Sequence, residues 1–487
     1  MLFNSYIFVL LFLPLALVGY FGLNHLHRYQ LANVFLIGMS LWFYGYYNPR
    51  YLLVIGISVL GNYGLAYGMN HLHERYMNWK KPILILGIVA NIASIFYFKY
   101  YDFFVSSLNA VAGTDFVLHH VVLPLGISFF TFQQVSYLVD TYRGQTKDYG
   151  FIEYALFVVY FPQLIAGPIV LHSEMIPQFR DENRRYVNYR NMSHGLYVFA
   201  IGLVKKVLIA DTLSKAVTWG FGAVDSLSVA EAWIVILSYT LQLYFDFSGY
   251  CDMASGIACM MNFKLPQNFN SPYRSTSIRD FWTRWHMSLT RFLTTYVYIP
   301  LGGNRKGKVR TYVNIMIVFL VSGLWHGANW TFIVWGVIHG IFSCINRMTR
   351  GVWERIPKGI RWFVNFVVIN LTWTIFRADS LTQTMDMYQR LFAWGQQGML
   401  QVREDLAYCF QLKEIAAVLP SSVGGIAISY FLMAIMLMGA LLLSVFARNS
   451  SEIRFEKTRR RAIWTVVLLI WGILSLNGVS EFLYFGF

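Results

Sequence analysis

Charged residues are scarce in this chain. Only 13% of its 487 residues are Asp, Glu, Lys or Arg, whereas soluble domains carry about 25%. Hydrophobic residues make up 56%, and long apolar stretches recur from one end of the chain to the other. A soluble chain of this length would show about two or three domains with polar surfaces. The composition therefore predicts a polytopic membrane protein and excludes an ordinary soluble enzyme.

Cysteine is scarce as well, and nucleotide-binding motifs are absent. The four cysteines form no CxxC pair and three lie in or beside apolar runs, so we expect neither a disulfide framework nor a metal site. The sequence has no P-loop, no GxGxxG and no GxSxG motif. Residues 1–22 lack a basic region and a small-x-small cleavage site, which predicts a retained first span.

Apolar segments long enough to approach a membrane crossing recur along the whole chain, since a spanning helix needs about 20 such residues. The candidates are residues 6–22, 31–47, 51–69, 82–98, 121–140, 203–222, 229–263, 312–324, 328–348, 362–376, 424–447 and 462–478. Two of them, 312–324 and 362–376, are short for a full crossing, and 229–263 is so long that it must be broken or extended. We expect an all-α fold of about 11–12 transmembrane helices plus re-entrant or in-plane helices. We predict a single integral membrane domain over residues 1–487, with its core motifs in 121–348.

Basic residues indicate how the chain is oriented. The net charge is +15, and the excess lies in loops between apolar segments, as the positive-inside rule predicts for cytoplasmic loops. We therefore expect no nucleic-acid partner. The basic loops are 71–81, 141–149, 174–190, 264–310, 349–361 and 448–461. Placing all of them in the cytoplasm puts the N-terminus outside in a multi-pass protein of the cell membrane.

One apolar stretch does not fit this alternation. Residues 157–170 lie between two basic loops, and Pro162, Gly167 and Pro168 interrupt them as a helix. We predict a re-entrant or in-plane element, which a membrane protein tolerates where it is buried in protein. Lys205 and Lys206 fit the orientation if the next span begins after them.

His326 is the foremost candidate for chemistry. It lies in the segment VFLVSGLWHGANWTFIVWGVIHG, residues 318–340, near the apex of a hairpin rooted on the cytoplasmic side, and the first arm is short. An ionisable residue in such a setting is a functional candidate. Gly323 and Gly327 are one turn apart and allow another backbone to approach. The alternative is a histidine that only bonds a neighbouring helix, an interpretation we favour for His339.

His286 lies in a second conspicuous segment, residues 271–310. Apolar residues recur there at spacings of three and four and predict one amphipathic helix at the cytoplasmic interface. They are Phe281, Trp285, Leu289, Phe292 and Tyr296. His286 falls at the edge of the polar face, where it faces either water or a buried cleft. An interfacial anchor without a chemical role is the alternative.

Two carboxylates lie inside an apolar run. Asp246 and Asp252 are six residues apart in LYFDFSGYCDMASG, residues 243–256, and buried carboxylates are costly unless they are paired. They would orient a histidine, bind a cation, or pair with Arg284 or with the stretch QNFNSPYR, residues 267–274. The spacing puts them on different helix faces, so a shared two-carboxylate site is expected only if the helix breaks at Gly249.

Together these segments resemble the membrane-bound O-acyltransferase (MBOAT) superfamily, in particular its bacterial branch of alginate O-acetylation and teichoic acid D-alanyl transfer proteins. The matching stretches are LPLGISFFTFQQVSYLVDTYRG (123–144), FPQLIAGPI (161–169), YFDFSGYCDMASG (244–256), QNFNSPYRSTSIRDFWTRWHMSLTRFLTTYVYIPLGGNR (267–305), GLWHGANWTFIVWG (323–336) and FLYFGF (482–487). They occur over most of the chain.

The resemblance implies a helical bundle around a central tunnel, with His326 as the essential family histidine and His286 as the second. It implies an acyl transfer from a cytoplasmic thioester, acetyl-coenzyme A or an acyl carrier protein, to hydroxyls of an alginate-like or other envelope polysaccharide. No cofactor is expected to be bound. His326 would be the general base, or would itself carry the acyl group. Trp325 and Asn329 would be oxyanion donors.

Other interpretations remain at this point. A D-alanyl transferase served by a carrier protein is the alternative within the family, and many relatives act with an acetyltransferase outside the membrane. A transporter of polysaccharide or lipid intermediates would share the spans and the buried carboxylates, and a scaffold would need neither histidine.

Overall fold

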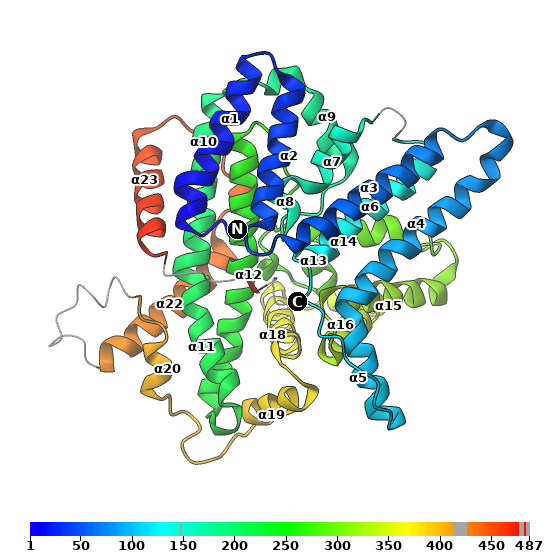
Figure 1. Cartoon of the computed structure of the whole chain (residues 1–487). Coiled ribbons are helices and arrows are strands. Elements are labelled where there is room, and N and C mark those ends of the chain that lie inside the picture. Colours follow the sequence, from blue (N-terminus) through cyan, green and yellow to red (C-terminus); the bar gives the residue numbers. More distant parts are fainter. Residues whose placement is uncertain (147–148, 413–425, 477–481, 484–487) are drawn as a thin grey trace. The chain divides into compact units, whose positions relative to one another are not determined.

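In a computed structural model the protein is helical, and the described residues, 1–146, 149–412, 426–476 and 482–483, form no strand (Figure 1). The chain divides into two compact units. Unit 1 comprises Met1–Phe199 and Met253–Pro266, and unit 2 comprises Ala200–Asp252 and Gln267–Phe487. The single domain over residues 1–487 stays a prediction. Parts of the predicted loops at 141–149 and of the spans at 424–447 and 462–478 lie outside the described residues, as do 484–487 of the FLYFGF motif.

Unit 1 is formed mainly by the N-terminal helices. They are η1 (Phe8–Phe12), α1 (Leu13–His25), α2 (Tyr29–Gly45), α3 (Arg50–Asn70), η2 (Glu74–Trp79), α4 (Lys80–Ile95), η3 (Phe96–Tyr100), α5 (Tyr101–Ala112), α6 (Ile127–Tyr142), α7 (Phe151–Val159), α8 (Phe161–Leu164), α9 (His172–Arg180) and η4 (Glu182–Arg184). Two longer helices, α10 (Tyr189–Val204) and α12 (Val229–Met260), contribute residues to both units.

Unit 2 contains the remaining helices. They are η5 (Lys205–Ala210), α11 (Asp211–Gly222), η6 (Val224–Ser226), η7 (Pro272–Arg274), α13 (Ile278–Trp282), α14 (Met287–Leu293), η8 (Thr294–Tyr298), α15 (Gly307–His326), α16 (Trp330–Met348), α17 (Arg350–Trp353), α18 (Lys358–Arg377), α19 (Leu381–Leu391), α20 (Glu404–Tyr408), α22 (Ile426–Phe446), η9 (Ser450–Glu452) and α23 (Arg459–Leu474).

Seven helical stretches among the described residues are long and apolar enough to cross a membrane. They are Phe8–His25, Arg50–Asn70, Glu74–Ala112, Gly307–His326, Trp330–Met348, Lys358–Arg377 and Ala427–Phe446. Each coincides with one predicted span, which confirms an all-α polytopic membrane protein. The other five predicted spans fall on helices outside this set, such as α6 with 16 residues and α12 with 32.

Two predicted lengths are wrong, whereas the expectation that 229–263 is extended is confirmed. The segments 312–324 and 362–376 belong to α15 and α18, which have 20 residues each because both helices begin inside basic loops. Polar residues at a helix start keep the backbone helical although they end the apolar run. The segment 229–263 holds the continuous helix α12, so its length is explained by a long helix and not by a break at Gly249.

The stretch 157–170 is interrupted as a helix, as predicted, and its re-entrant or in-plane position stays a prediction. Helix α7 ends at Val159, the four-residue α8 follows, and the chain then continues without regular structure to α9 at His172. All residues of this stretch are buried in unit 1. Irregular backbone at membrane depth is stable only with protein around it, and this burial meets that requirement.

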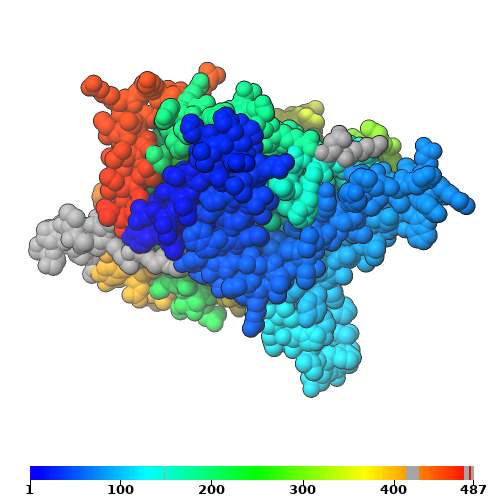
Figure 2. Space-filling model, turned by 45° about the horizontal axis from the view of Figure 1, so that its top comes forward, coloured from blue at the N-terminus to red at the C-terminus, as the bar shows by residue number. Residues whose placement is uncertain are grey.

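One arm of unit 1 is poorly covered by protein. The 39-residue stretch Glu74–Ala112 is buried over only 11% of its most apolar window. Figure 2 shows the blue and cyan surface of α4 and α5 extending from the rest of unit 1. Exposed side chains here include Ile85, Leu86, Val89 and Ile92. Such an apolar surface suits contact with lipid, because hydrocarbon chains replace the missing protein neighbours.

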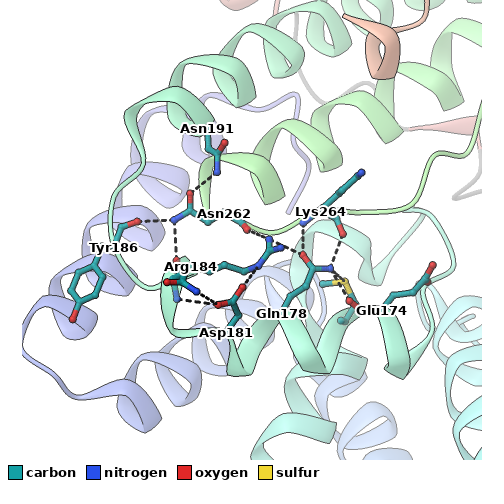
Figure 3. A network of polar contacts seen from close by, with 10 residues as sticks. Glu174, Gln178, Asp181, Arg184, Tyr186, Asn191, Asn262 and Lys264 are labelled. Carbon is teal, nitrogen blue, oxygen red and sulfur yellow. Dashed lines mark hydrogen bonds and ion pairs between the residues drawn. The ribbon is translucent and has the colours of Figure 1, made fainter. Parts of the chain in front are cut away.

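A polar network fixes the predicted basic loop 174–190 in unit 1 (Figure 3). Asn262 follows α12 with a left-handed backbone (φ 65°), and its Nδ2 donates to the carbonyl oxygens of Arg184 and Tyr186 at 2.9 and 2.7 Å. Gln178 and Lys264 exchange two further bonds of 3.0 and 2.8 Å. The loop is therefore part of the packed structure of unit 1.

Candidate active site

His326 lies at the apex of a helical hairpin, as predicted. It is the last residue of α15, the next residue Gly327 is extended, and Asn329 caps the start of α16. A Cβ added to Gly323 would clash with the carbonyl oxygen of Phe332 on α16. Close approach of the second arm therefore requires the glycine one turn before His326, as the sequence indicated.

Aromatic rings enclose the His326 side chain. The ring centroids of Trp325, Trp335 and Phe376 lie 4.9, 5.2 and 5.2 Å from the imidazole centroid, and His326 is 3% exposed. These rings come from α15, α16 and α18, so three helices of unit 2 build the enclosure. We call His286, Trp325, His326, Trp335 and Phe376 the histidine compartment.

His286 belongs to the same compartment. Its ring centroid lies 6.4 Å from that of His326 and 5.7 Å from that of Trp325, and the residue is fully buried. Phe247 of α12 packs on its other side at 4.9 Å. Two histidines forty positions apart in the sequence are thereby brought together, whereas the sequence analysis treated them as candidates in separate segments.

The single amphipathic helix predicted around His286 is wrong. The chain forms two short helices, α13 and α14, followed by the π-helix η8, and His286 precedes α14 with a left-handed backbone (φ 46°). The stripe residues Phe281, Trp285 and Leu289 are buried in unit 2. The apolar residues at spacings of three and four thus lie on two short helices joined by a buried turn, and not on one interfacial helix.

Burial controls the charge of His286. Desolvation lowers the pKa of its imidazole to about 3, because the charged form loses its hydration in a low-dielectric surrounding. The side chain is therefore neutral over the physiological pH range. Its Nδ1 lies 3.2 Å from Oδ1 of Asn268, a residue of the QNFN stretch to which the sequence assigned no role.

The predicted carboxylates have lysine partners in a second part of unit 2. Nζ of Lys206 lies 2.7 Å from Asp246 Oδ1 and 2.8 Å from Asp211 Oδ1. Nζ of Lys205 lies 2.6 Å from Asp252 Oδ2. We call these five residues the charge cluster. The expectation that Asp246 and Asp252 do not share one site is confirmed, since each carboxylate pairs with its own lysine.

Other residues complete the charge cluster. Oδ2 of Asp246 accepts a bond of 2.9 Å from the backbone N–H of Leu483, and Nζ of Lys206 lies 4.6 Å from the ring centroid of Phe482. Ser450 donates to Asp252. The sequence missed the lysines because the positive-inside rule assigned them to an interface. The available signal was that both lysines lie inside the apolar run around residues 203–210, where a charged side chain needs a partner.

Arg284 does not pair with the buried carboxylates. Its Nε lies 2.7 Å from Asp280 Oδ1, one helical turn away, and its Nη1 donates to the carbonyl oxygen of Asn270 at 3.3 Å. The predicted pairing with Asp246 or Asp252 is therefore wrong. A carboxylate four residues away is a closer partner than one on another helix.

Asn329 has a structural role. Its Oδ1 accepts from the backbone N–H of Thr331 at 3.1 Å, and its Nδ2 donates to the carbonyl oxygen of Asp379 at 3.0 Å. Both ends of the amide therefore have partners, and the side chain caps α16. His339 matches the structural interpretation, since its Nδ1 accepts from Trp282 Nε1 at 3.2 Å.

A cavity of about 320 Å³ adjoins this region of unit 2. Trp282 of α13, and Phe319 and Ser322 of α15, form part of its wall. Ser322 lies one helical turn before His326, so the cavity follows the side of α15 that carries the histidine. Arg279 and Arg347, both exposed, also line it.

Comparison with known proteins agrees with these features. Residues 44–385 match the family model described as MBOAT, membrane-bound O-acyltransferase family. A peptidoglycan O-acetyltransferase of Helicobacter pylori is 45% identical over 416 residues, covering 79% of this chain and 78% of that protein. The probable alginate O-acetylase AlgI of Pseudomonas aeruginosa is 41% identical over 404 residues, covering 81% and 75%. A teichoic acid D-alanyltransferase of Bacillus subtilis is 27% identical over 256 residues, covering 50% and 63%.

The match spans α2 to α19 and therefore includes both histidines, the hairpin and the charge cluster. Two relatives above 40% identity, each aligned over about four fifths of this chain, are named as O-acetylating enzymes. The chain belongs to the membrane-bound O-acyltransferase family and is a multi-pass membrane O-acyltransferase.

Proposed function

We propose that the enzyme transfers an acetyl group from a cytoplasmic thioester to hydroxyls of an envelope or exported polysaccharide. The observation that carries this proposal is the pair of buried histidines, 6.4 Å apart between ring centroids, in an aromatic enclosure. Acetyl as the acyl group is supported by the relatives named for peptidoglycan and alginate acetylation. Alginate-like and peptidoglycan acceptors are the two candidates.

His326 serves as the general base in this proposal. A hydroxyl is a weak nucleophile until a base removes its proton, a contribution of about 10²–10⁴-fold. The alcohol oxygen forms a bond to the thioester carbonyl carbon while its proton passes to the imidazole of His326. The C–S bond then breaks, and the proton leaves with the thiolate sulfur, so an ester and a free thiol are the products. A covalent acyl-histidine is the alternative route for the same residue.

The oxyanion that forms on the carbonyl oxygen needs hydrogen-bond donors. Trp325 lies in the compartment and remains a candidate. Asn329 also remains one, because its Nδ2 carries two N–H groups and gives one of them to the Asp379 carbonyl oxygen. Trp335 is a further candidate. Its Nε1–H is buried and has no hydrogen-bond partner among the described residues, and an indole N–H can only donate. A substrate oxygen would satisfy this group.

The donor would use the cavity beside α15. Arg279 and Arg347 line it, and guanidinium groups suit phosphates such as those of coenzyme A. The predicted cytoplasmic loops 264–310 and 349–361 place this side towards the cytoplasm. Acetyl-coenzyme A is the donor we favour, because its free phosphates match the two arginines. An acyl carrier protein is the alternative donor.

The acceptor would approach from the opposite side of the membrane. His326 would contact the acceptor near the outer side, because it lies at the apex of a hairpin whose arms begin on the cytoplasmic side. This orientation leaves the N-terminus outside. A partner acetyltransferase outside the cell membrane would then deliver the acyl group to the polysaccharide. Transfer of D-alanine is less supported, since those relatives align with only about half of this chain.

The test supplies [¹⁴C]acetyl-coenzyme A to membranes of the host cell with and without this chain. The proposal expects label in alkali-labile esters of polysaccharide only when the chain is present. Separate digestion with a muramidase and an alginate lyase identifies the acceptor. Label that appears equally in membranes without the chain, or only as D-alanyl esters of the acceptor when labelled alanine is supplied, would refute it.

A further inference from the structure

The backbone at His286 is strained. Its φ and ψ are 46° and 52°, in the left-handed region that residues other than glycine rarely adopt. Such a conformation persists only where the surroundings over-determine it, and it often occurs at functional sites. The contacts that hold His286 in this left-handed conformation therefore indicate the role of its side chain.

Asn268 supplies those contacts. Its carbonyl oxygen accepts from the backbone N–H of Met287 at 2.9 Å, and its Oδ1 accepts from the backbone N–H of Ser288 at 3.2 Å. The Ser288 hydroxyl donates to the same Oδ1 at 2.8 Å. Asn268 thus fixes both residues that follow His286, and it is itself 3% exposed.

The same oxygen fixes the tautomer of His286. A backbone N–H can only donate, so the Asn268 atom facing Ser288 is the amide oxygen and not the nitrogen. Nδ1 of His286 lies 3.2 Å from this oxygen and must therefore carry its hydrogen. In a neutral imidazole the other nitrogen, Nε2, then has the lone pair and acts as an acceptor.

The groups around the imidazole leave this assignment intact. Phe247 of α12 and Trp325 of α15 contact the ring. Titratable neighbours among the described residues include His326 on α15 and, beyond Asn268, the Cys251 thiol of α12, whose Sγ lies 3.4 Å from Asn268 Nδ2. Burial of His286 keeps its imidazole neutral.

We propose that Asn268 is a positioning residue for acyl transfer: it fixes His286 as the Nδ1–H tautomer, so that Nε2 enters the histidine compartment as a hydrogen-bond acceptor. This inference rests on the proposed function. His286 then accepts from an O–H or N–H of the reactants held beside His326, and it cannot donate to the oxyanion. In the opposite tautomer Nε2 would carry the hydrogen, and His286 would donate to the reactants instead of accepting from them.

The experiment measures acetyl transfer from [¹⁴C]acetyl-coenzyme A in membranes that contain the full chain at matched protein level. Asn268→Leu removes the acceptor, and we expect kcat to fall about 100-fold with KM for the donor within about twofold. Replacing a residue that orients a catalytic histidine, so that the wrong tautomer forms, can lower kcat by up to about 10⁴-fold. Ser288→Ala removes only one donor to the same oxygen, and a loss of no more than about threefold is expected.

Asn268→Asp separates positioning from a merely structural role. It keeps the acceptor oxygen, but its negative charge favours the imidazolium and raises the pKa of His286. The neutral form that carries the Nε2 lone pair is then lost as the pH falls through the raised pKa. We expect near-normal kcat at pH 8.5 and a new acidic decline in this variant that the wild type lacks.

The outcomes distinguish the inference from the proposed function. The inference is overturned if Asn268→Asp and Asn268→Leu lose activity equally with the wild-type pH profile. It is also overturned if His286→Ala or Asn268→Leu retains full activity. Should the leucine variant fail to accumulate, the pH profile of the aspartate variant decides alone. An active His326→Ala would instead refute the proposed function, whatever the Asn268 variants do.

Discussion

Two groups of ionisable residues in unit 2, the charge cluster and the histidine compartment, differ in the surroundings of their titratable side chains. In the charge cluster, Lys206 lies between Asp246 and Asp211, each within 2.8 Å. In the histidine compartment, aromatic rings surround His326 and His286, and burial keeps His286 neutral. The first region pairs its charges with one another, whereas the second places its imidazoles among aromatic rings.

This difference separates stability from chemistry. The charge of a buried lysine with carboxylates on two sides is compensated by them. Removing its proton would leave the carboxylates uncompensated, which costs free energy of folding. A neutral imidazole in an aromatic enclosure can accept a proton or a hydrogen bond when a reactant arrives. We therefore expect changes in the charge cluster to affect folding and changes in the histidine compartment to affect turnover.

The largest expected effect on turnover is that of His326→Ala. Loss of the general base should reduce acetyl transfer about 10²–10⁴-fold while the protein still inserts. His339→Ala is the matched control, since His339 is a buried histidine on the second arm of the same hairpin. We expect it to retain activity within about fivefold. Equal losses in the two variants would end the distinction between a chemical and a structural histidine.

The charge cluster is tested by Lys206→Met. Removing one partner of a buried ion pair typically costs about 3–5 kcal/mol, because the remaining charge is left uncompensated. Replacing Asp246 as well, in Lys206→Met/Asp246→Leu, should restore most of the free energy of unfolding. Denaturant unfolding in detergent, followed by tryptophan fluorescence, measures both. A double variant as unstable as the single one would contradict this account.

Trp335→Phe tests the histidine compartment without emptying it. The ring is kept while the Nε1–H is removed, and loss of one oxyanion donor typically costs about 10²–10³-fold in kcat. Trp373→Phe is the control, because it makes the same chemical change outside the compartment. The Trp373 ring stacks on that of Trp335, with 5.7 Å between the ring centroids. Comparable activity in the two variants would remove Trp335 from the proposed oxyanion site.

Arg279→Ala with Arg347→Ala tests the approach to the compartment. Both side chains line the cavity and are exposed, so their loss should leave folding intact and weaken phosphate binding. We expect KM for acetyl-coenzyme A to rise about tenfold with kcat nearly unchanged, as for uniform binding interactions. A donor without phosphates, such as an acetyl thioester of N-acetylcysteamine, should be used equally by wild type and variant.

The sequence predicted the hairpin apex and the interrupted element at 157–170, since glycine and proline positions are local signals. It failed on partners. Lys205 and Lys206 look like loop charges in any hydropathy profile, and only the fold reveals that α12 brings carboxylates to them. The turn at His286 was hidden as well, because an uninterrupted apolar stripe gives no sign of a left-handed residue stabilised by Asn268 eighteen positions earlier.

The smallest expected effect is that of Arg284→Ala. Arg284 was one of several candidate partners of the buried aspartates, but it pairs with Asp280 in a partly exposed i,i+4 arrangement. Such pairs stabilise a helix by about 0.3–0.5 kcal/mol, so unfolding should shift by no more than that. Acetyl transfer should stay within about twofold of wild type, because the Asn270 carbonyl can bond water instead. A loss as large as that of Lys206→Met would mean that Arg284 belongs to the charge cluster after all, and the boundary drawn between the two regions would have to move.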